Sequence, residues 1–415
     1  WNVAKSNWQF QIQMLLLQIG MLGCFAAMDV VLFYVFFEVM LVPMYLLIGI
    51  WGGPNRLYAT IKFFIYTMLG SLLMLISLLY TANIYLDLNG AWSFSVLDWY
   101  GMQIPPETQF WLFLGFAAAF AVKIPLFPLH TWLPDAHYEA PTAGSVQLAA
   151  VMLKFGPYGF LRFAMPIFPA AVFDLTPIFM VLALIGIIYG GLVAMVQPQI
   201  KRLIAYSSVA HMGYIVLGLF ALNIQGLSGS WIQMINHAIV TGALFLTVGM
   251  IYERTHTQEI SAYGGVAHTM PKFAVFLVFF SMASVGLPGL NGFVGEVLTM
   301  IGAARVNIWY GIVAAFGVLV AAIYMLWMVQ RVLFGPLTKD LVKNLNDFSL
   351  REVVVLVPLV FWTIFLGVYP QPFFDRIEVS INHYIELVKN QEPRFAQKEA
   401  KSSGLAKFLV WNLSE

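Results

Sequence analysis

The sequence predicts an all-α, polytopic membrane protein built as a bundle of helices. Of its 415 residues, 60% are hydrophobic and only 10% are charged, and the mean hydropathy is +0.82. Soluble domains carry about 25% charged residues. The hydrophobic residues form runs of the length that crosses a bilayer, about 20 residues, and the alternating pattern of a membrane β-barrel is absent. The net charge of +1 argues against nucleic-acid binding, which usually requires a basic face.

Eleven apolar runs are candidate transmembrane spans. They lie near residues 10–28, 30–51, 58–80, 108–133, 143–165, 173–196, 203–222, 229–252, 271–303, 308–333 and 352–369. The segment beyond Pro370 mixes acids and bases and is too polar to span. It is therefore expected to form an amphipathic helix on the membrane surface or on a neighbouring subunit.

Two of these spans are interrupted. In one, Lys123 precedes Pro125 and Pro128, and proline inside a helix removes backbone hydrogen bonds. In the other, the glycine-rich stretch 286–292 precedes Glu296. Each interrupted span is the fourth in a run of five, which predicts two inverted five-helix repeats with broken helices at the ion site. The alternative is that these are ordinary proline kinks of membrane helices.

The domain order follows from this layout. We expect a first inverted repeat over 1–170, a second over 171–335, a loop and last span over 336–370, and an amphipathic segment over 371–415. Most basic loop residues fall on one side of the predicted bundle, which the positive-inside rule makes cytoplasmic, or the matrix or stroma of an organelle. They are Arg56, Lys201, Arg202, Arg254, Lys272, Arg331, Lys339, Lys343 and Arg351. Lys62 and Arg162 lie closer to span ends and are expected to anchor the interface.

Several ionisable residues are placed inside the spans, where a charge costs about 2.5–3.5 kcal/mol even on the lenient insertion scale. This ionisable row consists of Glu38, Lys123, Lys154, His211, His237 and Glu296. Acids, lysines and histidines in such a row are the groups of a proton path. Structural alternatives are a Glu38 that only neutralises Lys123, a snorkelling Lys154, and histidines that are hydrogen-bonded core residues.

The proposed switch is an ion pair between Glu38 and Lys123. A nearby carboxylate favours the protonated form of a lysine, and losing that carboxylate in a desolvated site favours the neutral form. We expect Lys123 to pass its proton to Lys154, then by way of water and the two histidines to Glu296, which would face an exit half-channel.

No cofactor or metal site is expected on this chain. Cys24 is the single cysteine, which excludes a disulfide framework and a cysteine-held cluster. His130, Asp135, His137 and Glu139 could suggest metal binding, but the intervening prolines favour a polar loop. Nucleotide-binding glycine loops, nucleophile elbows and haem motifs are also missing.

Five stretches resemble the antiporter-like membrane subunits of complex I, the proton-pumping NADH:quinone oxidoreductase. They are KIPLFPLHTWLPDAHYEAPTAGS at 123–145, FFEVMLVP at 36–43, LKFG at 153–156, KRLIAYSSVAHMG at 201–213 and GLNGFVGE at 289–296. This family has about fourteen spans, so the resemblance implies that the chain begins near the fourth. Within the family, a glutamate at the end of the ionisable row is typical of one pumping subunit, whereas its sister subunits and cation/proton antiporter subunits usually carry lysine. Glu296 therefore favours the former.

The resemblance implies that Glu38, Lys123, Lys154, His237 and Glu296 are proton-path residues, with His211 as a linker. It implies that NAD, FMN, iron-sulfur clusters and quinone are held by other subunits. The expected partners are neighbouring antiporter-like subunits, the lipid bilayer and protons. The expected location is a bacterial plasma membrane, with the mitochondrial inner membrane as the alternative. Two rival functions stay open: a subunit of a sodium/proton antiporter, and a scaffold that conducts nothing.

Overall fold

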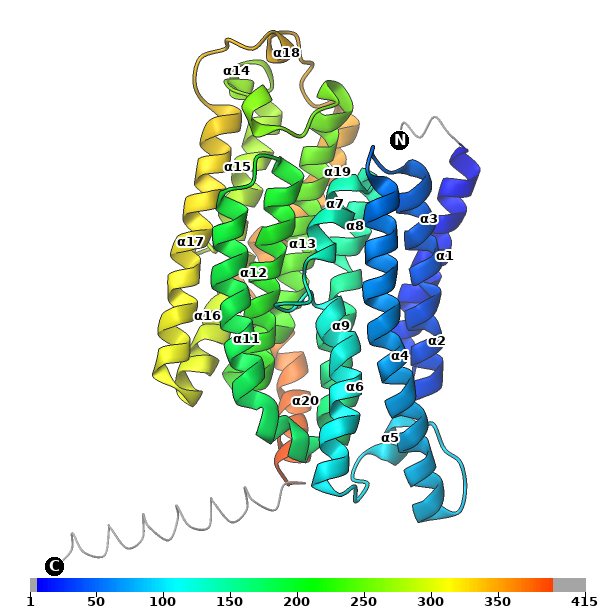
Figure 1. Ribbon diagram of the computed structural model, residues 1–415. Coiled ribbons are helices and arrows are strands. Elements are labelled where there is room, and N and C mark those ends of the chain that lie inside the picture. Colours follow the sequence, from blue (N-terminus) through cyan, green and yellow to red (C-terminus); the bar gives the residue numbers. More distant parts are fainter. Residues whose placement is uncertain (1–5, 391–415) are drawn as a thin grey trace, which may run out of the picture.

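The computed structural model describes residues 6–390, and in this part of the chain the secondary structure is helical, with two isolated β-bridges and no strand. Figure 1 shows a bundle of helices that run roughly side by side. Among the described residues, eight spans are long and apolar enough to cross a membrane. They are α1 (Asn7–Ala26), α2 with α3 (Val30–Trp51), α4 (Arg56–Asn89), α11 (Pro169–Met195), α12 (Ile200–Phe220), α13 (Ile224–Thr255), α17 (Ile308–Leu333) and α19 (Leu350–Val368). The predicted all-α membrane bundle is thereby confirmed.

The second span bends at Met40, between α2 (Val30–Val39) and α3 (Leu41–Trp51). Pro43 lies in the first turn of α3, where it cannot donate to the carbonyl group of residue 39. Glu38 is therefore placed one residue from the end of α2, beside an interruption that the apolar run did not reveal.

The other three predicted spans are divided into shorter helices. They become α6 (Pro106–Lys123) and α7 (Trp132–Glu139); α8 (Thr142–Ala150), η1 (Met152–Lys154), α9 (Phe155–Gly159), η2 (Phe160–Ala164) and α10 (Met165–Ile167); and α15 (Pro271–Val285) and α16 (Asn291–Val306). Figure 1 shows the break after α6 near the middle of the bundle. At the second break, Gly286 and Gly289 have φ angles of 82° and 92°, a left-handed conformation that glycine adopts without steric cost.

The segment from α8 to α10 is irregular along most of its length. It contains a 3₁₀ turn that ends at Lys154 and a π-helical turn that contains Arg162. Gly156 packs so closely on α6 that a Cβ atom there would lie 2.7 Å from the Phe120 carbonyl oxygen. π-helical turns are frequently found at functional sites, which makes Arg162 a candidate functional residue.

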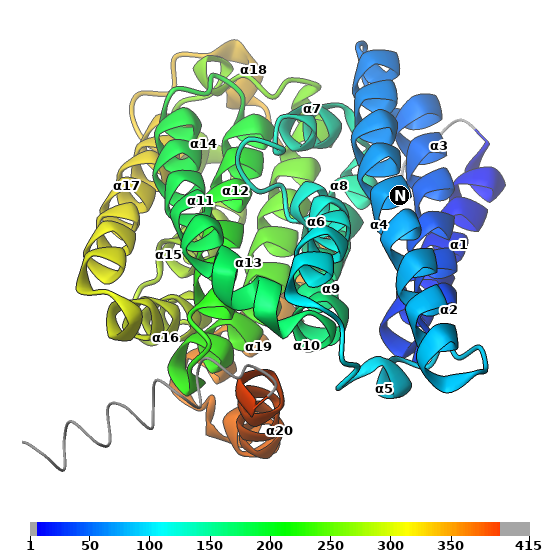
Figure 2. The ribbon, with the colours of Figure 1, turned by 60° about the horizontal axis from the view of Figure 1, so that its bottom comes forward.

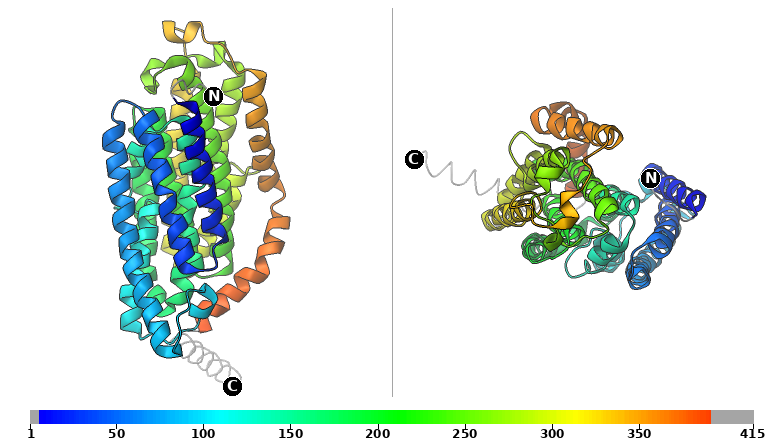
Figure 3. Two further views of the ribbon diagram at one scale, coloured as in Figure 1. Left: turned by 90° about the vertical axis from the view of Figure 1, so that its right-hand side faces the viewer. Right: turned by 90° about the horizontal axis from the view of Figure 1, so that it is seen from above.

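The remaining helices are short or lie at the ends of the bundle. They are α5 (Val96–Trp99), η3 (Ile260–Ala262), α14 (Val266–Thr269), α18 (Asp340–Lys343) and α20 (Gln371–Asn390). Figures 2 and 3 show α20 at the end opposite α18. Ile381, Tyr384 and Ile385 pack on the core, while residues 391–415 of the predicted amphipathic segment lie outside the described residues. The division into inverted repeats and domains stays a prediction.

Candidate functional site

The ionisable row is carried by separate helices that converge in the bundle interior. Five of its six members are buried, with 2–6% of each residue exposed, and Glu38 is partly buried. The carriers are α2 for Glu38, α6 for Lys123, η1 for Lys154, α12 for His211, α13 for His237 and α16 for Glu296.

Glu296 and His211 form the most direct contact in this row. The His211 Nδ1 atom lies 2.7 Å from Glu296 Oε1, and its Nε2 atom lies 3.2 Å from the Ser284 hydroxyl. The Gln233 amide donates to the same glutamate oxygen at 3.1 Å. Both ring nitrogens of His211 are thus hydrogen-bonded, so this residue can take a proton at one nitrogen and release one at the other.

Lys154 and His237 form the second contact. The Lys154 Nζ atom lies 2.7 Å from His237 Nδ1 and donates to the Ala149 carbonyl at 2.6 Å. The Ala149 carbonyl is available to accept this bond, because α8 ends at Ala150 and its regular backbone hydrogen bonds stop there. Lys154 points into the bundle toward α13, rather than snorkelling toward an interface.

A narrow polar cavity separates the two contacts. His211 and His237 face each other with their ring centroids 5.9 Å apart, and both line the cavity with Asn236 and Ser284. The His237 Nε2 and Asn236 Oδ1 atoms are buried without a protein partner. Water commonly bridges polar atoms across such a gap. We define the buried series as Lys154, His237, His211 and Glu296.

Small residues bring the carriers of this series together. A Cβ atom on Gly229 of α13 would lie 2.6 Å from the Thr299 backbone nitrogen of α16, and one on Gly295 would lie 2.3 Å from the Gln233 side chain. Close backbone approach through glycine is typical of packed membrane helices. The distance between His237 and Glu296 therefore depends on glycines that the sequence pattern did not single out.

Lys123 lies apart from the buried series. Its ammonium group is 4.8 Å from the centre of the Phe37 ring and 6.0 Å from that of Phe63. Glu38 interacts with it electrostatically, but no ion pair joins the two among the described residues, and no hydrogen bond links Lys123 to Lys154. The predicted switch pair is thus in an open arrangement.

The expectation of a polar loop around 130–139 was wrong. Residues 132–139 form α7, in which His137 and Glu139 are buried. Pro134 lies in the first turn of this helix, where proline is tolerated. Asp135 pairs with Lys62 at 2.8 Å and with Arg202 at 3.0 Å. Pro134 instead lies in the first turn of a buried helix, and Pro141 is the second residue after the end of that helix.

Two buried bases near this helix were missed as site residues. His137 stacks on Phe245 with centroids 4.5 Å apart, and neither ring nitrogen has a partner. It interacts electrostatically with Lys201 and with Lys154. Lys201, read from the sequence as a loop charge, is buried and donates to the Ala140 carbonyl at 2.8 Å. His137 thus lies close enough to both lysines to feel their charge, without a hydrogen bond to either within residues 6–390.

Comparison with known proteins identifies close relatives. The profile of the family described as "NADH:quinone oxidoreductase/Mrp antiporter, TM" matches residues 27–361. The chain is 49% identical to NADH-quinone oxidoreductase subunit M of Rhodobacter capsulatus over 395 residues, which cover 93% of this chain and 77% of the relative. It is 42% identical to NADH-ubiquinone oxidoreductase chain 4 of Chondrus crispus, over 94% of this chain and 78% of the relative.

A solved structure is similar as well. A chain in the structure of respiratory complex I from Thermus thermophilus with bound NADH superposes with a TM-score of 0.85 and 35% identity, covering 91% of this chain and 79% of that one.

Proposed function

The chain belongs to the family of membrane subunits shared by NADH:quinone oxidoreductases and Mrp antiporters, and from this premise we propose that it moves protons through the buried series. It is an antiporter-like subunit of the subunit M or chain 4 type of NADH:quinone oxidoreductase. The observation that carries the proton path is the hydrogen-bonded connection at each end of the series, 2.7 Å for Lys154 to His237 and 2.7 Å for His211 to Glu296.

The tautomers of the two histidines give the path its direction. The Lys154 ammonium donates to Nδ1 of His237, so the neutral ring carries its proton on Nε2, which lines the polar cavity. When Lys154 gives up a proton to Nδ1, His237 can release one from Nε2 toward His211 by way of a bridging water. His211 in turn passes a proton from Nδ1 to Glu296. Each ring receives at one nitrogen and donates from the other.

Lys123 is the proposed driver of this path. Its ammonium group has aromatic rather than carboxylate neighbours within contact distance, so movement of Glu38 toward it would change its charge balance strongly. Moving one charge against 100 mV costs about 2.3 kcal/mol. When a carboxylate approaches or leaves an ammonium group in a desolvated site, their electrostatic interaction energy changes by an amount of this order.

The redox chemistry is proposed to lie on other subunits, which would hold NAD, FMN, iron-sulfur clusters and quinone. The neighbouring partners would be other antiporter-like subunits. The chain is an integral membrane protein, and its relationship to the Rhodobacter subunit favours a bacterial plasma membrane over the mitochondrial inner membrane.

The test is Lys123→Met in the intact complex, reconstituted in proteoliposomes. NADH-driven acidification per electron should be lost, while Lys343→Met, at the exposed end of α18, should pump normally. A scaffold predicts altered assembly of the Lys123 variant with an unchanged proton count. A sodium/proton antiporter predicts sodium-dependent transport without NADH or quinone. Normal stoichiometry in the Lys123 variant would refute the driver role.

A further inference from the structure

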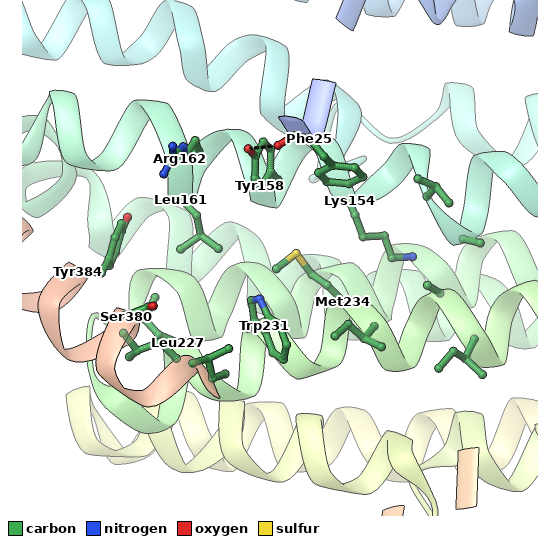
Figure 4. A pocket seen from close by; sticks show the side chains of 17 residues that line it. Phe25, Lys154, Tyr158, Leu161, Arg162, Leu227, Trp231, Met234, Ser380 and Tyr384 are labelled. Carbon is green, nitrogen blue, oxygen red and sulfur yellow. Dashed lines mark hydrogen bonds between the residues drawn. The ribbon is translucent and has the colours of Figure 1, made fainter. Parts of the chain in front are cut away.

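A large apolar cavity lies on the outer side of Lys154 and is not used by the proton path. It measures about 680 Å³ and is bounded by α1, α13, α20 and the irregular segment from η1 to η2. Its walls are mostly aliphatic and aromatic, and its polar groups are few: the Lys154 side chain, Arg162, Tyr158, Trp231, Ser380 and Tyr384. Figure 4 shows Arg162 and Tyr384 at one end of the cavity and Lys154 toward the other.

We propose that this cavity binds a membrane phospholipid, with one acyl chain between α13 and α20 and its anionic phosphate at Arg162. The inference does not rest on the proposed proton path. It rests on the apolar walls, on the charge of Arg162 and on the depth of that residue in the membrane.

Arg162 lacks the counter-ion that a cation in an apolar setting requires. Its guanidinium donates to the Met28 sulfur at 2.6 Å, which is a weak acceptor, and its Nε atom is buried without a partner. No carboxylate within residues 6–390 forms an ion pair with it. The Tyr384 hydroxyl, at the same end of the cavity, is also buried without a partner. A phosphate at this end of the cavity would give the Arg162 guanidinium an anionic acceptor, because arginine binds phosphate through several of its N–H groups.

The depth of Arg162 fits a headgroup. It is 20 residues after Thr142, where α8 begins at the basic end of the bundle. Its backbone carbonyl accepts a hydrogen bond from the hydroxyl of Tyr100, which lies in the loop between α5 and α6 at the opposite end of the bundle, so Arg162 lies near that membrane surface. Lys154 lies eight residues back along the irregular segment, toward the middle of the bundle. A lipid anchored at Arg162 would therefore extend its acyl chain along the cavity toward Lys154 and cover the apolar side of that residue.

The experiment uses the intact complex in phosphatidylcholine vesicles with a trace of photoreactive lipid. One probe is phosphatidylglycerol with a diazirine in an acyl chain, and the other is diacylglycerol with the same chains and no phosphate. Labelling of residues 227–239 and 377–384 is measured by peptide mass spectrometry. It is divided by the labelling of α17, whose outer face is exposed and which does not line the cavity, to correct for bulk lipid.

In the wild type, labelling by phosphatidylglycerol should exceed labelling by diacylglycerol about tenfold. A hydrogen bond to a charged group strengthens binding by about this factor. Arg162→Gln should lower this ratio to about one, Arg162→Lys should keep most of it because the charge remains, and Arg305→Gln should leave it unchanged. Arg305 is the matched control, since it is an exposed cation that bonds Gln225 on the same side of the bundle. Should Arg162→Gln not assemble, the lysine variant and the cavity variants below carry the test.

A second pair of variants tests the cavity itself. Ser380→Trp would fill it from α20 and should abolish labelling by both probes, whereas Val379→Trp, on the exposed side of the same helix, should not. Equal labelling by the two probes in the wild type would overturn the phosphate site. So would an unchanged ratio in Arg162→Gln, displacement of the lipid by a short-chain quinone, or cross-links showing that another protein segment fills the cavity.

Discussion

Replacing Lys154 tests the buried series most directly, because the two standard substitutions should fail for opposite reasons. Methionine has a similar length and no ionisable group, so it cannot accept a proton. Arginine keeps the positive charge but does not release its proton in proteins. The cavity beside Lys154 leaves room for the larger side chain. A structural cation would be rescued by arginine, whereas a proton carrier would not.

The size of the effect follows from the environment of Lys154. Without an acceptor there, a proton would cross this part of the bundle as a bare charge, at about 2.5–3.5 kcal/mol on the insertion scale. Since 1.36 kcal/mol corresponds to a factor of ten in rate, Lys154→Met should slow proton transfer by roughly 70- to 400-fold. Lys154→Met also leaves His237 Nδ1 and the Ala149 carbonyl without their donor, which should lower the free energy of unfolding by about 1–3 kcal/mol for each group.

The assay is NADH-driven acidification of proteoliposomes by the intact complex, normalised to NADH oxidation and to the amount assembled on native gels. Lys154→Met and Lys154→Arg should both pump at a few per cent of the wild-type rate or less, and Lys343→Met should pump normally. Wild-type stoichiometry in Lys154→Arg would show that only the charge matters, and the relay reasoning would then be refuted.

Three further predictions concern the surroundings of the series. Glu296→Gln keeps the shape of the side chain but removes its proton-binding carboxylate. Acidification per electron should therefore fall at least tenfold, with normal assembly of the complex. Unchanged acidification would exclude Glu296 from the path. Gly229→Val would place a side chain against the backbone of α16. Thermal unfolding of the complex should then show that its stability falls by about 1–3 kcal/mol. Wild-type stability would mean that α13 and α16 are not tightly packed there. Asp135→Asn breaks two partly exposed ion pairs, with Lys62 and Arg202, and should cost no more than about 2 kcal/mol in the same measurement; a larger loss would show that α7 depends on these pairs.

The spans themselves follow from hydropathy, because a helix that faces lipid must satisfy its own backbone and remain apolar for about 20 residues. Within residues 6–390, eight of the eleven predicted spans are long and apolar enough to cross a membrane, and one of these bends at Met40. The breaks after Lys123 and before Glu296 were also visible, since Pro125 and Gly286 interrupt helices for local reasons. The 3₁₀ turn at Lys154 and the π-helical turn at Arg162 were not, because they depend on packing against α6 and α13.

The sequence by itself determined which side chains form the ionisable row, because a charge inside an apolar run is conspicuous wherever the chain later folds. Only the tertiary structure decided which of them meet. It joins Lys154 to His237 and His211 to Glu296, and it leaves Lys123 over aromatic rings. It also turns His137 and Lys201 inward, where the sequence indicated a loop. The physical reason is that the cost of burying a charge depends on the membrane around that residue, which the local sequence shows. The partner that offsets this cost comes from a helix that is distant in the sequence. The distance between the two groups is fixed by side-chain and backbone packing.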